Sequence, residues 1–544
     1  MEVKIDIGKL SENITLKSIE NVTYTQIPEE ELRKYFSFLK ENSLINADNF
    51  DDSVWLIYNE NKDREIIFKF DLEMYQELNK ALKGYILLKR MTGTAITTCQ
   101  SILMTLKRVI LKTSKFEDLK ELEIFLVSQT PIVGFNTAGI IRLFLTFYEH
   151  PLSSEIIDIC NSIKAPEKKN RELPYFPDVI AFDEIVEEFF SSFKSEEYFR
   201  FYPILIWWKL TNVLPMRIIE VLKLKKNCID KKKDGTFWII LPREKKKANS
   251  PFKLDITDTV QINKETYEII LCYINFIDNN KVETEYLFPY DLYVKFLPNP
   301  KGSSGQRKGK KNRLIDKYIQ RILDDFYSHV IQNESLEKIN LGDTRHFAIM
   351  NMFLQGFNML SIARMAGHDN LEMQFNYYSH IDHYVQSQVY LLAQKKLELN
   401  IENKIGKTIN NTSRYLYDKG LIYEDIELEK LRKVDFGYCS NLDFPKDCVG
   451  ECKVCQPFYI FKPAVNDLEE GLKWLTDYSQ SIQRNIQEVT EMMFSLSKNM
   501  FYDLQNRKYQ ESGQTKLNSA SSQLTRLMDQ RSTVEAWIRR YQDE

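Results

Sequence analysis

The sequence predicts a mainly α-helical protein with a small antiparallel β component. Three observations predict this class. Amphipathic helical patterns dominate from residue 72 onward, β-forming residues gather in only a few short runs, and residues 464–544 carry apolar positions in steps of four and three. At 544 residues, with 43% hydrophobic and 28% charged side chains, the chain is long enough for several domains, each with its own core.

Residues 1–70 are predicted to form an N-terminal α+β segment. The run VWLIYNENKDREIIFKFD is interpreted as two strands around the turn Asn61-Lys62-Asp63. The start, MEVKIDIGKL, lacks a basic stretch followed by an apolar run, and FYPILIWWKLTNVLPM is too short and interrupted to span a bilayer. We therefore expect a cytoplasmic protein without membrane contact, in a compartment where disulfides are rare.

Residues 71–164 are predicted to form a helical bundle with a basic face. Four amphipathic patterns follow one another, and two of them carry basic residues that we expect to bind DNA: Lys83, Lys89, Arg90, Lys107, Arg108 and Lys112. The stretch APEKKNRELPYFPD, residues 165–178, combines three prolines with clustered charge and is interpreted as a linker.

Residues 179–400 are predicted to be a second helical region with one β-hairpin. GTFWIILP is rich in β-forming residues, turns through REKKKANSP and returns as FKLDIT. Trp207 and Trp208, ahead of the hairpin, are expected in the core. Helices resume after the hairpin, interrupted by a basic Gly/Ser loop at residues 301–313 whose cations we expect to contact DNA: Arg307, Lys308, Lys310 and Lys311.

The net charge of −3 by itself argues against a nucleic-acid partner. Binding follows the local charge pattern, however, and three basic clusters flank one segment: LKLKKNCIDKKKDG, PREKKKANSPFK and KGSSGQRKGKKNR. One such run alone is usually a solvated turn. Three of them together favour an anionic partner.

Residues 401–463 are predicted to be an extension with a zinc-knuckle-like segment. Cys439, Cys448, Cys452 and Cys455 follow the spacing C-x8-C-x3-C-x2-C, and four thiolates so close in sequence suit a tetrahedral structural zinc site. Such a knuckle would contact DNA or brace the helices that follow. The other cysteines are expected to be buried thiols: Cys99, Cys160, Cys228 and Cys272.

Residues 464–544 are predicted to form a helical hairpin or coiled coil. The first helix carries a seam, interrupted at Ser479, of Leu468, Leu472, Leu475, Ile482, Ile486, Val489, Met493, Leu496 and Met500. ESGQT is expected to break this helix, and a second helix carries Leu517, Leu524, Leu527, Val534 and Ile538. The pair is interpreted as a hairpin or as an arm that binds a partner protein.

Four of the six histidines lie between His346 and His383, close to two adjacent tyrosines. Arg345 and His346 are predicted at a helix start, His368 after a glycine turn, and Tyr377 nine positions after His368. Much earlier, TNVLPMRIIEVLKL places Arg217 in an apolar helix with Glu220 one turn on. Because an arginine on the core side of a helix is unfavourable unless paired, either Glu220 neutralises Arg217 or the guanidinium is held for an anion.

In these motifs the chain resembles the tyrosine recombinases, or phage integrase family, over roughly residues 72 to 395, and is similar to the large type encoded by transposons. The family pattern is an Arg with an acid three residues later, a Lys on a β-hairpin, His-x-x-Arg-His, Gly-His, and a Tyr nine residues after that His. The resemblance implies that residues 71–164 are a helical core-binding domain and that residues 1–70, which carry no motif of their own, are a candidate DNA-binding arm. With a catalytic domain at residues 179–400, this bundle would clamp DNA.

The resemblance also implies a role for each matching residue. Tyr377 would attack a DNA phosphodiester and hold the cut strand as a 3′-phosphotyrosine. Arg217 and Arg345 would bind the non-bridging oxygens, and His368 would add a hydrogen bond. The hairpin lysine, Lys245, would protonate the departing 5′-oxygen. Supporting roles around these groups fall to Glu220 and His346.

Three points stay open at this stage. Lys246 and Lys247 are alternatives to Lys245, because the hairpin tip is longer than usual. Tyr378 is the alternative nucleophile, because it precedes His380 in a Tyr-x-His ending. Gly342 stands where the family has the first His of its motif, which puts one acid or base in doubt. His380 and His383 are interpreted as a solvated helix face, and Tyr384 as core or surface.

The expected function is that of a site-specific recombinase or transposase that integrates or excises a mobile element without a catalytic cofactor. Expected partners are double-stranded DNA at recombination or attachment sites, further copies of the chain, and accessory recombination proteins at the C-terminal helices. A bacterial, nucleoid-associated location follows from this reading. The alternative is a catalytically weak or inactive DNA-binding subunit of a recombination complex, which Gly342 and the ambiguous lysine support.

Overall fold

The structure is a computed structural model that describes residues 2–542 except 12–13, 22, 43, 167–171, 193–195, 244–255, 297–310, 369–379, 404–430, 442–444, 446–447, 449, 456–457 and 506–510. The chain divides into two compact units. The first combines Met1–Lys169 with Ile219–Ile322, and the second combines Asn170–Ile218 with Leu323–Glu544. Most of the described residues are helical, and every sheet is small and antiparallel, as the sequence predicts.

The first part of unit 1 is an α+β arrangement around a single core. Its elements are β1 (Glu2–Ser11), β2 (Ile14–Asn21), α1 (Glu29–Glu41), β3 (Val54–Asn59), β4 (Arg64–Lys69), α2 (Gln76–Met91), α3 (Ile96–Lys112), α4 (Leu119–Val127), α5 (Pro131–Leu145) and α6 (Ser153–Ser162). The buried hydrophobic residues between Leu32 and Cys160 form one cluster. Residues 24–70 and the helical bundle therefore share one core.

The predicted strands around residues 61–63 form the β3–β4 hairpin, in register from Val54↔Lys69 to Asn59↔Arg64. Trp55 and Ile57 on β3 and Ile66 and Phe68 on β4 are buried, because side chains two apart on a strand face the same side. The centroid of the Trp55 ring lies 4.6 Å from that of Phe70. This hairpin is thus held by its core face, which leaves its turn free to contact other parts of the unit.

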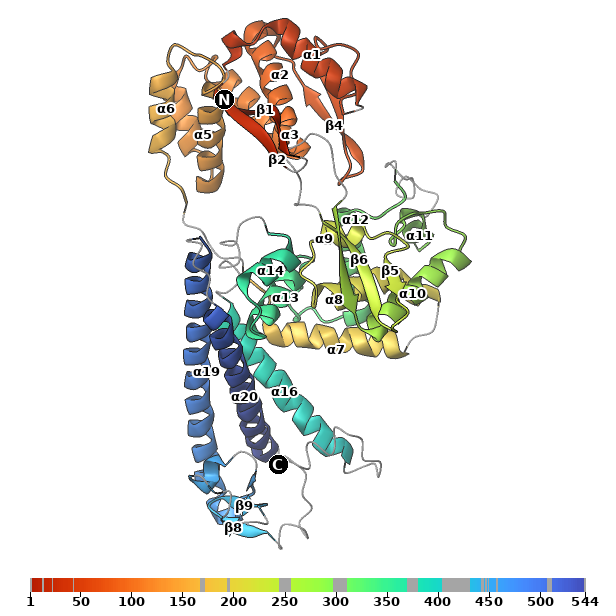
Figure 1. The fold of residues 1–544 in the computed structure, drawn as a ribbon, viewed down its shortest axis with the longest axis vertical. Helices are drawn as coiled ribbons and strands as arrows, with labels where there is room; N and C mark the ends of the chain where they lie inside the picture. The colour runs from red at the N-terminus through yellow and green to blue at the C-terminus, as the bar shows by residue number, and fades with distance from the viewer. Residues whose placement is uncertain are drawn as a thin grey trace. The chain divides into compact units, whose positions relative to one another are not determined.

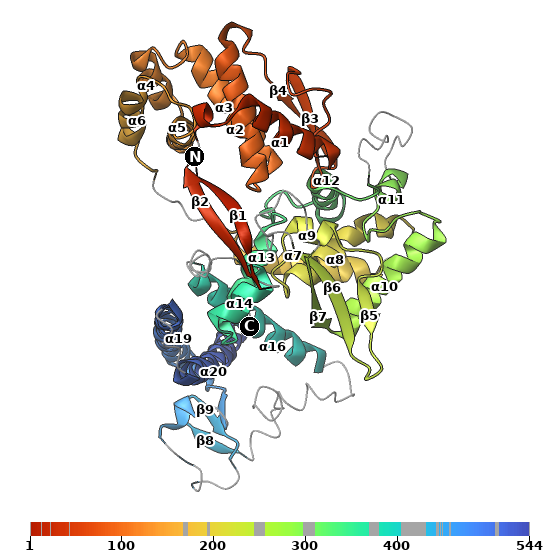
Figure 2. The ribbon, with the colours of Figure 1, turned by 45° about the horizontal axis from the view of Figure 1, so that its top comes forward.

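The second part of unit 1 is built on a three-stranded sheet in the order β5-β6-β7. The strands are β5 (Ile229–Lys231), β6 (Phe237–Arg243) and β7 (Ile256–Ile262), and α10 (Lys264–Asn279) packs beside them (Figure 2). The other helices are α9 (Ile218–Leu222), α11 (Tyr290–Lys295) and α12 (Asp316–Phe326). The predicted hairpin is present, and the first residues of its predicted return strand, 252–255, lie outside the described residues.

Unit 2 contains the helices α7 (Phe176–Ser192), α8 (Tyr202–Thr211), α13 (Asp343–Leu354), α14 (Met359–Ala366) and α16 (Ile381–Asn403), with a π-helical turn at Tyr327–Ile331. Trp207 and Trp208 are buried, as predicted. The indole Nε1 of Trp207 donates to the Leu341 carbonyl at 3.2 Å, which ties α8 to the segment before α13. Among the helices that the structure describes, none combines the length and the apolar character that a membrane crossing needs.

The C-terminal part of unit 2 has a small sheet and two long helices. The strands β8 (Arg432–Val434), β9 (Gly437–Cys439) and β10 (Tyr459–Phe461) are followed by α19 (Leu468–Gln505) and α20 (Glu511–Gln542). The two helices pack against each other, and α16 packs against α20 (Figure 1). ESGQT does not break the helix as predicted, since it forms the first turns of α20. The coiled-coil seam stays a prediction.

A buried lysine fastens α16 to α20. The Lys396 ammonium is 7% exposed and has four acceptors on α20: the Asp529 carbonyl at 2.9 Å, the Asp529 carboxylate at 2.8 Å, Ser532 Oγ at 2.7 Å and Thr533 Oγ1 at 2.8 Å. A buried cation is tolerated when its donors are all used. The contact therefore specifies where the C-terminal helices dock on α16.

Replacing Lys396 by Met is expected to lower the free energy of unfolding by about 2 kcal/mol, because the acceptors of α20 lose their donor. Lys498→Met, at an exposed lysine of α19, is the control and should change stability by less than about 0.5 kcal/mol. Urea unfolding followed by circular dichroism measures both. Equal effects of the two substitutions would show that the Lys396 contact contributes nothing specific.

Candidate active site

The site is organised by the C-terminal end of helix α14. The helix begins after Asn358, whose side chain accepts from the Ser361 N–H at 2.8 Å. It ends at Gly367, which adopts the left-handed conformation with φ 60° and ψ 47°. Glycine suits this position because a side chain there is strained. The last carbonyls of a helix lack intrahelical partners and carry partial negative charge, so they attract cationic donors.

Two guanidinium groups bind consecutive carbonyls at this helix end. Nη2 of Arg345, on α13, donates to the Ala366 carbonyl at 2.7 Å. Nη2 of Arg217, just before α9, donates to the Gly367 carbonyl at 3.0 Å. Arg345 also donates through Nη1 to the Pro215 carbonyl, two residues before Arg217. The structure thus brings together the two arginines that the sequence predicts at one anion site, although Arg217 precedes its helix instead of lying within it.

His368 lies at the same edge. Its Nε2 is 2.9 Å from Nη2 of Arg345. Because a guanidinium only donates, Nε2 is the acceptor, and a neutral His368 ring carries its proton on Nδ1. The side chains of Arg217, Arg345 and His368 therefore meet around the backbone of residues 366–368, and together they can surround a single phosphate.

The start of α13 positions Arg345 without a side chain at residue 342. Gly342 is the N-cap, and the Asp343 carboxylate instead accepts from the backbone N–H of Asn340 at 2.7 Å and from its amide at 3.1 Å. Thr344 is fully buried, and its hydroxyl lies 2.7 Å from that of Thr211 on α8. Gly342 itself therefore supplies no acid or base to the site.

The base of the β6–β7 hairpin in unit 1 holds a buried arginine that the sequence reasoning missed. Nε of Arg243 donates to Asp258 at 2.8 Å, and its Nη1 lies 3.9 Å from the fully buried Glu220 carboxylate. The predicted supporting acid, Glu220, therefore faces the hairpin arginine. Strand alternation was the available signal, because Ile239, Leu241 and Arg243 are two apart and all buried. Lys245, Lys246 and Lys247 lie outside the described residues.

Both candidate nucleophiles, Tyr377 and Tyr378, lie outside the described residues. The helix that follows them, α16, is fixed to α13 through Tyr384, whose ring centroid lies 6.4 Å from that of Phe347 and 5.3 Å from that of Phe176. Burial raises the pKa of Tyr384 to about 12. Tyr384 is therefore core, and it links the helix after the tyrosines to the helix that carries Arg345.

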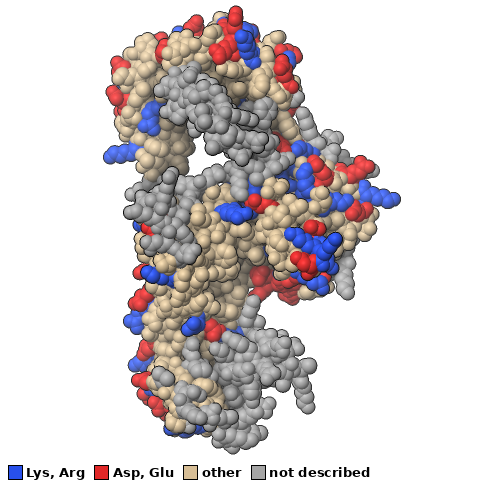
Figure 3. Space-filling model, in the orientation of Figure 1, with Lys and Arg blue, Asp and Glu red and all other residues tan. Residues whose placement is uncertain are grey.

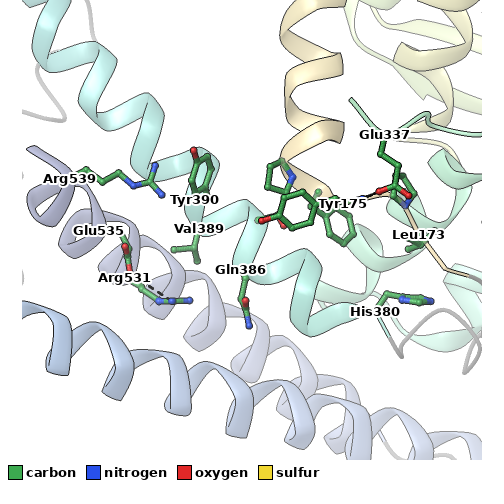
Figure 4. A pocket seen from close by; sticks show the side chains of 14 residues that line it. Leu173, Tyr175, Glu337, His380, Gln386, Val389, Tyr390, Arg531, Glu535 and Arg539 are labelled. Atoms are coloured by element: carbon green, nitrogen blue, oxygen red, sulfur yellow. Dashed lines mark hydrogen bonds and ion pairs between the residues drawn. The ribbon is translucent and has the colours of Figure 1, made fainter. Parts of the chain in front are cut away.

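Of the remaining histidines, His346 is half-buried on α13, and His383 lies in α16. His380 does not lie on a solvated helix face. It lines a cavity of about 480 Å³ within unit 2, together with Tyr175, Glu337, Tyr390 and Arg531 (Figure 4). Neither Arg217 nor Arg345 lines this cavity. It is therefore separate from the candidate active site.

The basic face predicted for the helical bundle is not one exposed surface. Lys83 is buried, its ammonium donates to the Phe50 carbonyl at 2.8 Å, and burial lowers its pKa. Arg90 is buried and donates to the Thr94 carbonyl at 2.6 Å. Lys89 lies over the Tyr85 ring, and Lys107 pairs with Asp71. Of the six predicted residues, Arg108 and Lys112 are exposed.

The predicted loop residues Arg307, Lys308 and Lys310 lie outside the described residues. Lys311 is described, and its ammonium lies 2.6 Å from Glu60 Oε1 in the same unit. An acidic side chain therefore already occupies this predicted DNA contact.

The four cysteines of the tail lie close together. Cys439 ends β9 and pairs with Tyr459 of β10. Burial raises the pKa of the Cys455 thiol, and the nearby thiols Cys439, Cys448 and Cys452 raise it further. Within the described part of the chain, however, no three His, Cys, Asp or Glu side chains are arranged as a metal site. Cys99, Cys160 and Cys228 are buried, as predicted, whereas Cys272 is exposed.

The family model described as "Phage integrase family" matches residues 207–384, the stretch that holds Arg217, Arg345 and His368. No curated protein sequence matches the chain. Residues 207–384 are therefore a phage integrase domain, the domain of the tyrosine-type site-specific recombinases. The resemblance predicted from the motifs is confirmed for this part of the chain.

Solved structures of recombinases are also similar to the chain. XerH site-specific recombinase bound to palindromic difH substrate, in a post-cleavage complex, has 13% identity over 66% of this chain and 95% of that chain, with a TM-score of 0.38. The Tn1549 transposon integrase in complex with transposon right end DNA has 13% identity over 55% and 94%, with a TM-score of 0.36. XerA recombinase has 14% identity over 55% and 93%, with a TM-score of 0.26.

Gly367→Ala is expected to lower the free energy of unfolding by about 1 kcal/mol, because φ of 60° is unfavourable for alanine. The new Cβ would lie 3.5 Å from Nη1 of Arg217, an ordinary contact, so the loss is conformational. Gly139→Ala within α5 is the control and should be neutral or stabilising. Thermal unfolding midpoints test this, and a Gly367→Ala midpoint at or above that of Gly139→Ala would contradict it.

Proposed function

We propose that the chain cuts and rejoins DNA strands through a 3′-phosphotyrosyl intermediate, as a recombinase that integrates or excises a mobile element. One observation carries the proposal: Arg217 and Arg345 bind adjacent carbonyls at the end of α14, beside His368. Paired guanidinium forks match the geometry of phosphate oxygens. The site is therefore suited to a phosphodiester whose negative charge increases during the reaction.

Each step of the proposed chemistry has a group to perform it. The phenolic oxygen of Tyr377 forms a bond to phosphorus, and its proton passes to water. The bond from phosphorus to the 5′-oxygen breaks, and the hairpin lysine, Lys245, protonates that oxygen. In rejoining, a 5′-hydroxyl attacks the phosphotyrosine and releases Tyr377. The covalent link conserves the energy of the cut bond, so no nucleotide or metal ion is consumed.

Gly342 supports a second candidate function, that of a DNA-binding subunit with weak or absent catalysis. The N-cap of α13 has no side chain, so a proton carrier at this position is missing. The two arginines and His368 would still bind a phosphate in such a subunit. The two functions differ in one product, the covalent protein–DNA adduct.

The proposed DNA contacts are local. Positive and negative side chains alternate over the visible face in Figure 3, which agrees with a net charge of −3. The proposed DNA contacts are Arg108 and Lys112 on α3 and the loop residues Arg307, Lys308, Lys310 and Lys311. We place further copies of the chain on paired DNA sites, and accessory proteins at α19 and α20.

We also propose that Cys439, Cys448, Cys452 and Cys455 hold a structural zinc ion. The support for this site is that Cys439, Cys448 and Cys452 lie near Cys455, whose pKa is raised by burial and then by these thiols, together with a spacing that suits tetrahedral thiolate ligands. Binding would draw the four sulfurs together and lower their pKa values, since the ligand is the thiolate.

Tyr377→Phe is expected to abolish the covalent adduct with nicked attachment-site DNA and to leave DNA affinity within about twofold, because only the nucleophilic oxygen is lost. Denaturing gels and mass mapping of the modified peptide measure the adduct. Tyr378→Phe is the matched control and should still be trapped. Trapping that survives in Tyr377→Phe and disappears in Tyr378→Phe would assign the nucleophile to Tyr378. An unmodified protein that binds DNA but forms no adduct would favour the non-catalytic subunit.

The purified chain is expected to contain about one zinc ion, and Cys452→Ser should remove most of it. Elemental mass spectrometry measures the metal content, and a chelator should lower the unfolding midpoint of the unmodified protein. Cys272→Ser, at the exposed cysteine of α10, is the control and should retain zinc. Zinc-free protein whose midpoint does not respond to added zinc would refute the site.

A further inference from the structure

The turn between β3 and β4 contacts the segment at residues 311–313 within unit 1. The Lys311 ammonium lies 2.6 Å from Glu60 Oε1, and the Lys311 backbone N–H donates to Asp63 Oδ2 at 3.0 Å. Nη2 of Arg313 donates to the Glu60 carbonyl and, at 3.4 Å, to the Asn61 carbonyl. We call this set of contacts the clasp. It joins two segments that are about 250 residues apart in the sequence.

The acidic side of the clasp is rigid and oriented in advance. Asp63 has φ of 45°, a conformation that aspartate tolerates better than most residues. Its other carboxylate oxygen accepts from the Tyr58 hydroxyl, and burial followed by this hydrogen bond raises the pKa of Tyr58. The Asn59 side chain accepts from the Lys62 N–H at 3.0 Å, which fixes the turn.

The two basic residues of the clasp are held to different degrees. Arg313 is 2% exposed and donates to backbone carbonyls, so its contacts are structural. The Lys311 and Glu60 side chains are 29% and 27% exposed. Because both side chains are partly exposed, water and salt screen this ion pair and weaken it. Lys311 can therefore leave Glu60 while Arg313 stays in place.

A carboxylate and a backbone phosphate are both oxyanions that accept hydrogen bonds from an ammonium group. Glu60 thus occupies on Lys311 the place that a DNA phosphate would take. Lys311 also directly follows the basic run KGSSGQRKGK in the sequence. A DNA strand that binds this run would meet Lys311 next.

We propose that the β3–β4 turn is an internal competitor for DNA: Glu60 holds Lys311 in the free protein, and a DNA backbone phosphate displaces it. This inference rests on the proposed function, because it requires that the chain binds DNA. It assigns to the β3–β4 turn of the N-terminal α+β segment a role in modulating DNA binding by the rest of the unit.

Glu60→Gln tests the competition in the full chain, by stopped-flow association with a labelled DNA duplex. The substitution keeps the Glu60 carbonyl that receives Arg313 and removes the charge that holds Lys311. We expect association about fivefold faster than in the unmodified protein, the factor that corresponds to a weak ion pair. Glu65→Gln on β4 is the matched control, because it removes the same charge from the same hairpin.

Tyr58→Phe provides a second variant without a change of net charge. It removes the hydrogen bond that orients Asp63, and it should accelerate association in the same direction by a smaller factor. In the background of Lys311→Met, Glu60→Gln should bring no gain. Hydrogen exchange adds a separate readout, since DNA should increase deuterium uptake at residues 58–64 of the unmodified protein.

The outcomes separate this inference from the proposed function. If Glu60→Gln and Glu65→Gln bind DNA equally fast, or if DNA protects residues 58–64, the clasp is a fixed joint and the inference is wrong. If all variants bind DNA but none forms a covalent adduct, the inference stands while the catalytic proposal fails. If no variant binds DNA, both fail.

Discussion

The candidate active site depends on two adjacent backbone carbonyls, those of Ala366 and Gly367. They are the unpaired acceptors of the last turn of α14, and each receives a guanidinium that arrives from a different part of the chain. A partly buried guanidinium needs acceptors, and a helix C-terminus needs donors. The two guanidinium groups supply the donors that the helix end needs, and the two carbonyls supply the acceptors that the guanidinium groups need. The arginines are therefore held in position before a phosphate arrives.

This arrangement explains why the surroundings are so tightly specified. Arg345 is placed by α13, whose first turn is fixed by Asn340 and by Thr211 on α8. Arg345 also donates to the Pro215 carbonyl, two residues before Arg217, and this hydrogen bond fixes the backbone that leads into Arg217. Donors that are already oriented need not reorganise when charge develops on a phosphate, and in the proposed reaction this electrostatic preorganisation would stabilise the transition state. The elements around the end of α14 therefore hold the guanidinium groups of Arg217 and Arg345 in fixed positions relative to each other.

The sequence predicted the structure best at positions where a residue type strongly favours one conformation or one kind of partner. Gly367 before His368 predicted a turn, which is the left-handed end of α14. The apolar surroundings of Arg217 predicted a guanidinium either neutralised by Glu220 or held for an anion, and the structure adds a hydrogen bond to the Gly367 carbonyl. The sequence was less informative where a long side chain can be buried or exposed. Lys83 and Arg90 are buried and donate to backbone carbonyls, and the Lys83 ammonium also lies over the Phe50, Trp55 and Phe70 rings, an environment that composition cannot distinguish from a basic surface. The Arg243–Glu220 pair depends on tertiary contacts between α9 and β6, which only strand alternation could suggest.

The C-terminal helices are not a separate appendage, because they complete the helix that carries Arg345. Ser521 on α20 donates to the Leu354 carbonyl at 2.7 Å, and Gln514 donates to the Gly356 carbonyl at 2.9 Å. Leu354 is the last residue of α13, whose carbonyl has no partner within the helix, and Gly356 lies just beyond the helix end. Helix α13 is thus held by Asn340 at one end and by α20 at the other.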